Sequence, residues 1–249
     1  MARSVVLQSH THPLPYDWLV ECIASVKKWS ELNAFGYRFI GDELFDYIPT
    51  CLNEKTRHQL VIASDLARLK LIRSFLNQGF ETVIWCDADF LIFDPDNFLI
   101  PNESFALGRE VWIQRDRKHA SKLSAHVKVH NAFMMFRTDN SFLDFYHDSA
   151  ERLLTRINGP MPPQFIGPKL LTAIHNVVQC PVLETAGMLS PLVMTDLEQG
   201  GGPALDLFKS KSPQAIAGAN LCASLHKSGE TSARIIEACI NRLSDNRAV

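Results

Sequence analysis

Two carboxylates one residue apart, Asp87 and Asp89, follow a short apolar run that begins after Gly79. The run has the length and the β-branched content of a buried strand. A buried ionised carboxylate is costly unless a paired charge or a metal compensates it. Mg²⁺ and Mn²⁺ take oxygen ligands and keep positions open for phosphate oxygens, and ligands bind beyond the carboxyl ends of strands in open α/β sheets. The pattern predicts a metal and diphosphate site at these residues, with a pair of ordinary turn carboxylates as the alternative.

A second pair of charged residues, Asp65 and Arg68, lies one predicted helix upstream of the D-x-D sequence. Ser64 is a suitable N-cap, Asp65 falls in the first turn, and Gly79 closes the pattern. Apolar residues recur at helical spacing at Leu66, Leu69, Ile72 and Leu76. Residues three apart share a helix face, so a carboxylate that can accept hydroxyl protons lies beside a guanidinium that can bind oxygens. An ordinary surface ion pair is the alternative interpretation.

The S-D-x-x-R helix followed by a D-x-D strand resembles the D-x-D sugar-transferase family, glycosyltransferase family 32, and more distantly the glucosylating domains of large clostridial toxins. Four later segments resemble further family motifs in the same order: N-x-F-[IM], G-P-x-x-[LF]-T, a Pro-containing strand and A-x-x-H. They are His130–Met134, Ile166–Thr172, Ser190–Leu192 and Leu225-His226. The resemblance covers roughly residues 4–230.

The resemblance implies an α/β protein with one GT-A domain over residues 1–249, a Rossmann-like nucleotide-sugar-binding fold with a mixed central sheet flanked by helices. It also implies a hexosyltransferase that depends on Mn²⁺ or Mg²⁺. The donor would be a nucleotide-sugar, UDP- or GDP-linked, and the hexose would be transferred with retention. The acceptor is unknown and could be a glycan, a lipid or a small molecule.

The resemblance further assigns roles to individual positions. The implied catalytic residues are Asp65, Arg68, Asp87 and Asp89. The implied donor-binding residues are Val6, Leu7, Gln8, Asp65, Arg68, Asp87, Asn131, Gly167, Pro168 and Lys227. The implied metal ligands are Asp87, Asp89 and His226. For His226, a satisfied histidine at a strand end is the alternative, and the Trp that usually follows the family's histidine is missing here.

Two other functions compete with the transferase hypothesis. A non-catalytic nucleotide-sugar-binding protein could keep the same fold, although an intact Asp65, Arg68, Asp87 and Asp89 set favours an enzyme. A phosphohydrolase of the haloacid dehalogenase type would use Asp87 as its nucleophile. In that class a Thr or Val normally stands two residues after the second Asp, whereas Asp89 is followed by Phe90-Leu91.

Composition narrows the class of protein. The chain has 249 residues, of which 46% are hydrophobic and 21% are charged. This composition predicts a globular protein with enough apolar residues for a sizeable hydrophobic core. A net charge of −2 gives no electrostatic footprint for nucleic acid. The six cysteines lack zinc spacing and favour buried thiols in a reducing compartment. No apolar stretch approaches the ~20 residues of a membrane span and no signal peptide is evident, so we expect no integral membrane segment and a cytoplasmic location.

The remaining patterns predict elements that would position the site. Expected strands are Val5–Gln8, Tyr37–Ile40, Phe105–Leu107, Val111–Gln114 and Val129–Phe136. Expected helices are Pro15–Trp29, a helix capped by Asn140, a helix opened by Gly167-Pro168 that ends at Val178, and residues 231–243. Residues 115–128 and 159–163 are expected to be loops, the first of them near the acceptor.

Overall fold

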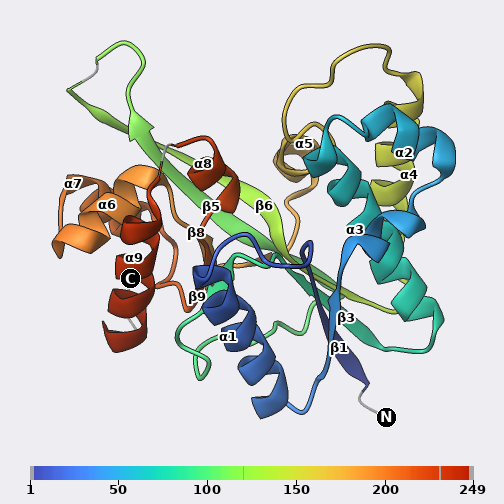
Figure 1. Cartoon of the computed structure of the whole chain (residues 1–249), viewed down its shortest axis with the longest axis horizontal. Helices are drawn as coiled ribbons and strands as arrows, with labels where there is room; N and C mark the ends of the chain where they lie inside the picture. The colour runs from blue at the N-terminus through green and yellow to red at the C-terminus, as the bar shows by residue number, and fades with distance from the viewer. Residues whose placement is uncertain (1–2, 120, 230, 247–249) are drawn as a thin grey trace.

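The structure is a computed structural model that describes residues 3–119, 121–229 and 231–246, leaving aside the side chains of Lys227 and Asn246. A central sheet has one group of helices, α2 to α5, at one end and a second group, α6 to α9, at the other, and α1 lies near its first strands (Figure 1). The helices are α1 (Trp18–Leu32), η1 (Asp42–Tyr47, a 3₁₀ helix), α2 (Thr50–Thr56), α3 (Leu60–Asn77), α4 (Ser141–Arg156), α5 (Pro168–Val178), α6 (Pro191–Gln199), α7 (Pro203–Lys211), α8 (Ala223–Lys227) and α9 (Ala233–Asn246).

The strands form two sheets. The strands are β1 (Ser4–Ser9), β2 (Gly36–Ile40), β3 (Thr82–Cys86), β4 (Phe90–Ile92), β5 (Phe105–Arg115), β6 (Leu123–Arg137), β7 (Val182–Leu183), β8 (Ala186–Met188) and β9 (Gly218–Asn220). The six-stranded sheet has the order β2-β1-β3-β6-β5-β7 and the three-stranded sheet the order β4-β9-β8. In the large sheet β1 runs parallel to β2 and β3, whereas β6 is antiparallel to both β3 and β5. The predicted fold class, α/β with a mixed central sheet flanked by helices, is confirmed.

The hydrophobic residues of both sheets are buried against the helices that flank them. One cluster packs α3, α4 and α5 on the large sheet, and another packs α1, α6, α7 and α9 around β5 and the small sheet. A third lies between the two sheets, where Trp29 and Phe98 contact each other with ring centroids 5.2 Å apart. Both sheets are therefore packed against hydrophobic residues on two faces. This packing fixes the positions of the strand ends and of the turns that follow them.

The D-x-D sequence is the turn by which the chain leaves the large sheet and enters the small one. β3 ends at Cys86 and β4 begins at Phe90, so Asp87 and Asp89 lie between the two sheets. The backbone N–H of Asp87 donates to Ala132 of β6 at 2.8 Å, and the backbone carbonyl of Asp89 accepts from Leu221 N–H at 2.9 Å. The backbone of Asp87 is thus bonded to the large sheet, and the backbone of Asp89 to the residue that follows β9 of the small sheet.

Two predicted boundaries near the site are wrong. Helix α3 begins at Leu60 with Gln59 in the N-cap position, so Ser64 is not the cap and instead donates its hydroxyl to Val61 O at 2.9 Å. The predicted N-cap is wrong because the four residues before Ser64, residues 60–63, already belong to the helix. The apolar segment 190–192 is not a strand, because Pro191 opens helix α6, a position where its missing N–H has no cost.

The predicted loop 115–128 is wrong over its second half. Strand β5 is one strand with a bulge between Leu107 and Gly108, and it continues to Arg115. Strand β6 then begins at Leu123, so the two form a long hairpin with a short tip (Figure 1). Near the C-terminus, the apolar segment before His226 is not a strand: Leu221 and Cys222 follow the end of β9, and residues 223–225 begin the short helix α8.

No helix among the described residues has the length and apolar character needed to cross a membrane.

Candidate functional site

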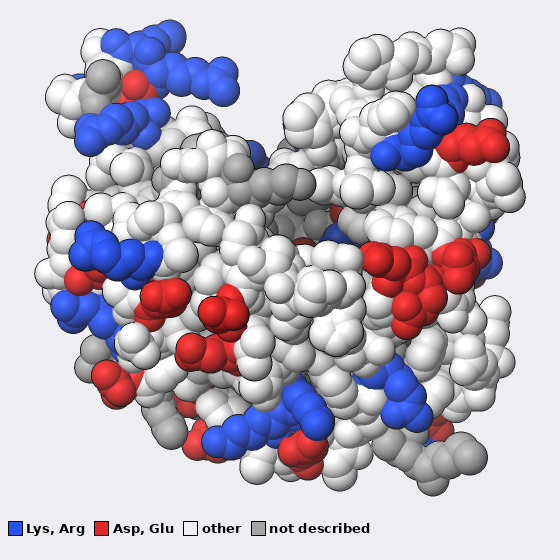
Figure 2. Space-filling model, in the orientation of Figure 1, with Lys and Arg blue, Asp and Glu red and all other residues white. Residues whose placement is uncertain are grey.

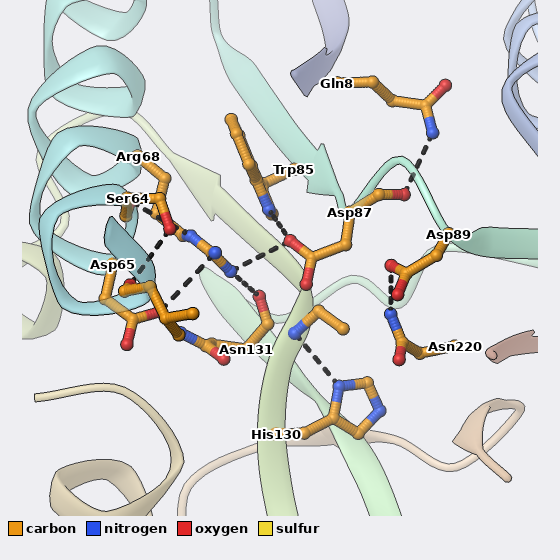
Figure 3. Close-up of polar contacts among 12 residues, drawn as sticks. Gln8, Ser64, Asp65, Arg68, Trp85, Asp87, Asp89, His130, Asn131 and Asn220 are labelled. Atoms are coloured by element: carbon orange, nitrogen blue, oxygen red, sulfur yellow. Dashed lines mark hydrogen bonds and ion pairs between the residues drawn. The ribbon is translucent and has the colours of Figure 1, made fainter. Parts of the chain in front are cut away.

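Asp87 is held by side chains and backbone groups from four elements of the large-sheet half. Its Oδ1 accepts a hydrogen bond from the indole N–H of Trp85 at 2.7 Å and an ion-pair contact from Nη1 of Arg68 at 2.9 Å. Its backbone carbonyl accepts from Nε2 of the fully buried Gln8 at 3.0 Å (Figure 3). Trp85, at the end of β3, and Gln8, at the end of β1, therefore fix the position of this carboxylate from the carboxyl ends of parallel strands.

Arg68 is the centre of a buried charge network. Its Nη1 also donates to the backbone carbonyl of Asn131 at 3.0 Å, its Nη2 lies 3.5 Å from Asp65 Oδ1, and its guanidinium carbon lies 5.0 Å from the centroid of the Trp85 ring. Burial lowers the pKa of Arg68, but the carboxylates of Asp87 and Asp65 outweigh that effect and raise it. The guanidinium therefore stays charged and compensates the Asp87 carboxylate at close range.

Asp65 is a buried carboxylate with one oxygen left over. Its Oδ1 accepts from Nδ2 of Asn131 at 2.7 Å, whereas its buried Oδ2 has no hydrogen-bond partner among the described residues. A Cβ placed on Gly167 would come within 2.4 Å of that oxygen, so only glycine leaves the space in front of it. Burial raises the pKa of Asp65 to about 6, in spite of Arg68 and Asn131, which lower it. A buried acceptor without a partner is costly, and a ligand hydroxyl could supply the missing donor.

Asp89 is held by neutral groups of the small-sheet half. Its Oδ1 accepts from Nδ2 of Asn220 at 2.6 Å (Figure 3). Its Oδ2 accepts from the backbone N–H of Ala223 at 2.7 Å. None of the ion pairs found among the described residues includes Asp89. Burial, together with the nearby Asp87 carboxylate, raises the pKa of Asp89 to about 6. This carboxylate is thus oriented by the protein without being neutralised by it.

His130 fixes the segment of β6 that supports the site. Its Nδ1 accepts from the backbone N–H of Ala132 at 3.1 Å, so Nε2 carries the proton and donates to Ala186 O, 3.1 Å away in β8. Burial lowers the pKa of His130 to about 4, which keeps the ring neutral. A Cβ on Gly108 would overlap the His130 ring, so the glycine at the β5 bulge leaves room for it. The next residues, Asn131 and Ala132, then present their carbonyls to Arg68 and Asp87.

Two cavities meet at the D-x-D turn. The first has a volume of about 320 Å³ and lies against the end of β1 and the 3₁₀ helix η1, with His10, Thr11, Asp42 and Phe45 among its lining residues. The second has a volume of about 410 Å³ and lies against the hairpin and the start of α5. Volumes of this size are typical of small-molecule sites. Residues that line both cavities are Val61, Ser64, Arg68, Asp87 and Asp89.

The two aspartates fit a site for a divalent cation. Asp87 Oδ2 faces away from Arg68 (Figure 3), and each oxygen of Asp89 accepts a single hydrogen bond, which leaves a second lone pair. Among the described residues, no three His, Cys, Asp or Glu side chains are grouped to hold a metal ion. Mg²⁺ is often held by one or two carboxylates and completed by substrate phosphates and water, so two carboxylates at the edge of two cavities are a sufficient donor set.

The structure brings together most of the residues that the sequence singles out. Asp65, Arg68, Asn131 and Pro168 line the second cavity together with both aspartates of the D-x-D turn. Gly167 lies against Asp65 and Asn131. Gln8 acts through Asp87, whose backbone carbonyl it binds, and Tyr37 donates to its Oε1 at 2.9 Å.

The predicted residues Val6, Leu7 and His226 do not line either cavity. Val6 and Leu7 are fully buried in the hydrophobic core between neighbouring strands of the large sheet. The Nδ1 of His226 lies 2.7 Å from Thr231 O, and its ring packs edge-on against Tyr16, 4.5 Å between centroids. The side chain of Lys227 lies outside the described part of the chain.

Sequence reasoning missed several residues of the site. Asn220 and Ala223 orient Asp89 but belong to a short strand and a helix start that carry no motif. Trp85 could have been found, because it stands two residues before Asp87 and its side chain therefore points to the same face of the strand. Glu110 and Trp112 line the second cavity and follow a period of two along β5, a signal present in the sequence.

No family model matches the chain, and none of the curated proteins matches it. Among solved structures, the chain is similar to a glycosyltransferase involved in the glycosylation of the major capsid of PBCV-1, with 10% identity, 94% of this chain and 98% of that chain covered, and a TM-score of 0.49. It is also similar to the galactosyltransferase LgtC in complex with donor and acceptor sugar analogues, with 12% identity, 95% of each chain covered and a TM-score of 0.45. A third similar structure is A197 from STIV, with 7% identity, 72% of this chain and 79% of that chain covered, and a TM-score of 0.30. At identities and scores this low, the function has to follow from the geometry of the site itself.

Proposed function

We propose that this protein is a metal-dependent glycosyltransferase with a single GT-A domain, which moves a hexose from a UDP- or GDP-linked sugar to an acceptor with retention. The observation that carries the proposal is the state of Asp89. It is a carboxylate with a pKa raised to about 6, at the junction of two cavities, oriented by two neutral donors. A cation bound by diphosphate oxygens would supply the missing positive charge.

Asp89 and the free oxygen of Asp87 would hold the cation, Mn²⁺ or Mg²⁺. When bound, the cation would neutralise the negative charge that develops on the departing nucleoside diphosphate. The chain itself contributes orientation. Asp65 Oδ2, which has no partner among the described residues, would accept a hydrogen bond from a hydroxyl of the donor sugar. Arg68 would keep Asp65 and Asp87 in place.

The two cavities suit two ligand portions on either side of the D-x-D turn. The cavity at the end of β1 would take the nucleoside, since it lies at the carboxyl ends of parallel strands, where nucleotides bind in open α/β sheets. The cavity against the hairpin would take the donor sugar near Asp65 and the acceptor beyond it. The residues shared by both cavities would then surround the diphosphate.

In the phosphohydrolase alternative the first aspartate would attack phosphorus. Arg68 and Trp85 engage Asp87 Oδ1 but leave Oδ2 free, so release of inorganic phosphate has to be assayed beside glycosyl transfer. A non-catalytic protein that binds a nucleotide-sugar would share every donor-side feature, so turnover has to separate it from the transferase.

The test is thermal stabilisation by a panel of nucleoside diphosphates and nucleotide-sugars, with Mn²⁺ and with chelator. We expect one nucleotide to raise the melting temperature when Mn²⁺ is present and not when chelator is present. A ligand that binds the folded state stabilises it by mass action. Release of free nucleoside diphosphate from the matching nucleotide-sugar, measured over time, would then separate the enzyme from a binding protein. A flat response to every nucleotide, with and without Mn²⁺, would reject the proposal.

A further inference from the structure

The β5–β6 hairpin presents polar and aromatic side chains on one of its faces. Side chains alternate between the two faces of a strand, so the residues of one face can be read from the pairing of the strands. Paired across the hairpin, the members of this face are Glu110 and Lys128, Trp112 and His126, and Gln114 and Ser124. The opposite face carries Val111 and Ile113, which are buried against the helices of the small-sheet half. The polar face is therefore directed away from the core.

The polar face forms a continuous groove that starts in the site. Its inner end, with Glu110 and Trp112, lines the cavity beside Asp65 and Asp89. Its outer end lines a second hollow of about 520 Å³. Gln114 and Lys128 line both spaces, so the two spaces adjoin along this face of the hairpin.

The inner part of the groove has the chemistry of a sugar subsite. Trp112 is half-buried and offers a flat apolar surface with a polar indole N–H. Glu110 is buried and lies 3.9 Å from Lys128, with burial raising its pKa and Lys128 opposing the rise. A sugar ring has apolar C–H faces and hydroxyls at its rim, which match an aromatic surface flanked by carboxylate and amide groups.

The outer end of the groove is positively charged. Arg117, Lys118 and Lys122 are exposed at the hairpin tip, and Figure 2 shows Lys and Arg gathered there, beside a hollow that separates the tip from the helices of the opposite lobe. The carboxylate in the tip, Asp116, is engaged by the backbone N–H groups of Lys118 and His119, both at 2.8 Å. Since the whole chain has a net charge of −2, this cluster is a local feature suited to an anionic group.

The groove is also too long for one sugar ring. Arg115, at the end of β5, lies five residue steps beyond Glu110, which corresponds to about 17 Å at the usual rise per residue of a strand. Resting on the proposed transferase function, we infer that the polar face of the β5–β6 hairpin binds the acceptor. The acceptor is an oligosaccharide of several units that bears negative charge at the end remote from the reacting hydroxyl.

The test compares two saccharides of equal length, tetragalacturonate and its neutral methyl ester, by titration of the full chain in the presence of Mn²⁺. We expect the anionic form to bind at least tenfold more tightly at low salt, with the difference reduced at high salt by screening. The variant Arg117→Gln/Lys118→Gln/Lys122→Gln should lose that difference. Trp112→Ala should weaken both saccharides alike, because the ring contact does not depend on charge.

Matched controls carry the same changes elsewhere on the surface. Lys27→Gln/Lys28→Gln/Lys209→Gln removes three exposed charges from helices α1 and α7, and Phe145→Ala removes an exposed aromatic ring from α4. Both should bind the two saccharides as the unaltered protein does. Equal binding of the anionic and neutral forms, or absence of binding by both, would overturn the inference. So would tip-dependent binding to phosphatidylglycerol vesicles without binding to the saccharide.

Nucleotide binding is measured on the same samples to keep the two proposals separate. Stabilisation by Mn²⁺ and nucleoside diphosphate should be unchanged in the tip variant, because the tip lies outside both cavities at the D-x-D turn. Nucleotide binding without tip-dependent saccharide binding would overturn this inference and leave the proposed function intact. Tip-dependent saccharide binding without any nucleotide response would support the surface and reject the proposed function.

Discussion

The two aspartates of the D-x-D turn are held by different sheets and by different kinds of partner. Asp87 belongs to the large-sheet half, where Arg68 and Trp85 bind the same carboxylate oxygen at 2.9 and 2.7 Å. Asp89 belongs to the small-sheet half, where an amide side chain and a backbone N–H bind it without neutralising it. The protein compensates the charge of Asp87 with Arg68, whereas no ion pair found among the described residues compensates Asp89. The large-sheet half should therefore govern stability, and the small-sheet half should govern metal binding.

The largest expected effect is the loss of stability in Arg68→Met. Removing the guanidinium leaves Asp65 and Asp87 without their cation, and removing one partner of a buried ion pair costs about 3–5 kcal/mol. The free energy of unfolding from urea titration measures this change. Arg234→Met, which removes an exposed partner of Glu198, is the control and should cost well under 1 kcal/mol, as exposed ion pairs do. A similar cost for both variants would remove the basis of the comparison.

The second effect concerns Asp89→Asn, which should change ligand binding far more than stability. Affinity for nucleoside diphosphate in the presence of Mn²⁺ should fall by about 100-fold or more, equivalent to about 2.7 kcal/mol, while affinity with chelator stays as it was. The stability loss should stay small, since the variant gives up one hydrogen bond but also a buried negative charge. Calorimetric titration with and without Mn²⁺ measures the affinities. Unaltered Mn²⁺-dependent affinity would show that Asp89 is not a metal ligand.

Asp65→Asn should sharpen the comparison within the large-sheet half. The substitution replaces one carboxylate oxygen of a residue that lines the second cavity with an N–H donor, so a sugar hydroxyl bound to Asp65 would lose its acceptor. A hydrogen bond to a charged group contributes about 1.5–3 kcal/mol, so affinity for the nucleotide-sugar should fall about 10- to 100-fold. Affinity for the bare nucleoside diphosphate should be unchanged. Equal losses for both ligands would mean that Asp65 acts on the fold or on the diphosphate.

The smallest effect is a pH dependence that the metal should modify. The pKa values of Asp65 and Asp89 are raised to about 6 from an unfolded value near 3.9. Their stability contribution is therefore fully present below about pH 4 and lost as the pH rises through about 6. Above pH 6, Mn²⁺ with nucleotide should restore the stability that is lost when Asp89 becomes ionised. We expect the melting temperature to rise by about 2–4 °C, which corresponds to about 1 kcal/mol for a chain of this size.

Melting temperatures between pH 4 and pH 7.5 check this prediction in the unaltered chain and in Asp89→Asn. The variant should lose the Mn²⁺-dependent part of the pH profile and keep the part that Asp65 contributes. An identical profile in both proteins would place the titrating group elsewhere.

The fold near the site followed from the sequence where local signals and burial agree. The all-apolar strand β3 and the i,i+3 pair of Asp65 and Arg68 are such cases, because both are set by short-range periodicity. The outer part of the hairpin was not predicted, because the charged and polar composition of residues 115–128 is typical of a loop. The alternating apolar residues at the start of β6, Leu123, Ala125 and Val127, are the strand signal within that segment. The composition therefore predicted the loop at the tip, but it did not predict the strand that begins at Leu123.

The partners of Asp89 could not be predicted for a different reason. Asn220 lies 131 residues from Asp89 along the chain, and their contact depends on the antiparallel pairing of β4 and β9. No local pattern specifies that pairing, since β9 is the short sequence Gly-Ala-Asn. The orphaned oxygen of Asp65 is likewise a tertiary property, because it depends on the approach of Gly167 from a distant loop.

The hairpin tip is the part of this surface that can vary most freely. The described tip residues, 116–119, 121 and 122, belong to none of the hydrophobic clusters, and the strands on both sides of them are paired before the tip begins. Changing the length of an exposed loop costs little conformational entropy, roughly 0.6 kcal/mol for each doubling. Insertions or replacements here would leave the D-x-D turn and its supports untouched. Under the proposed function, a lineage of such proteins could therefore acquire new acceptors by altering a few tip residues, while the proposed donor site is inherited unchanged.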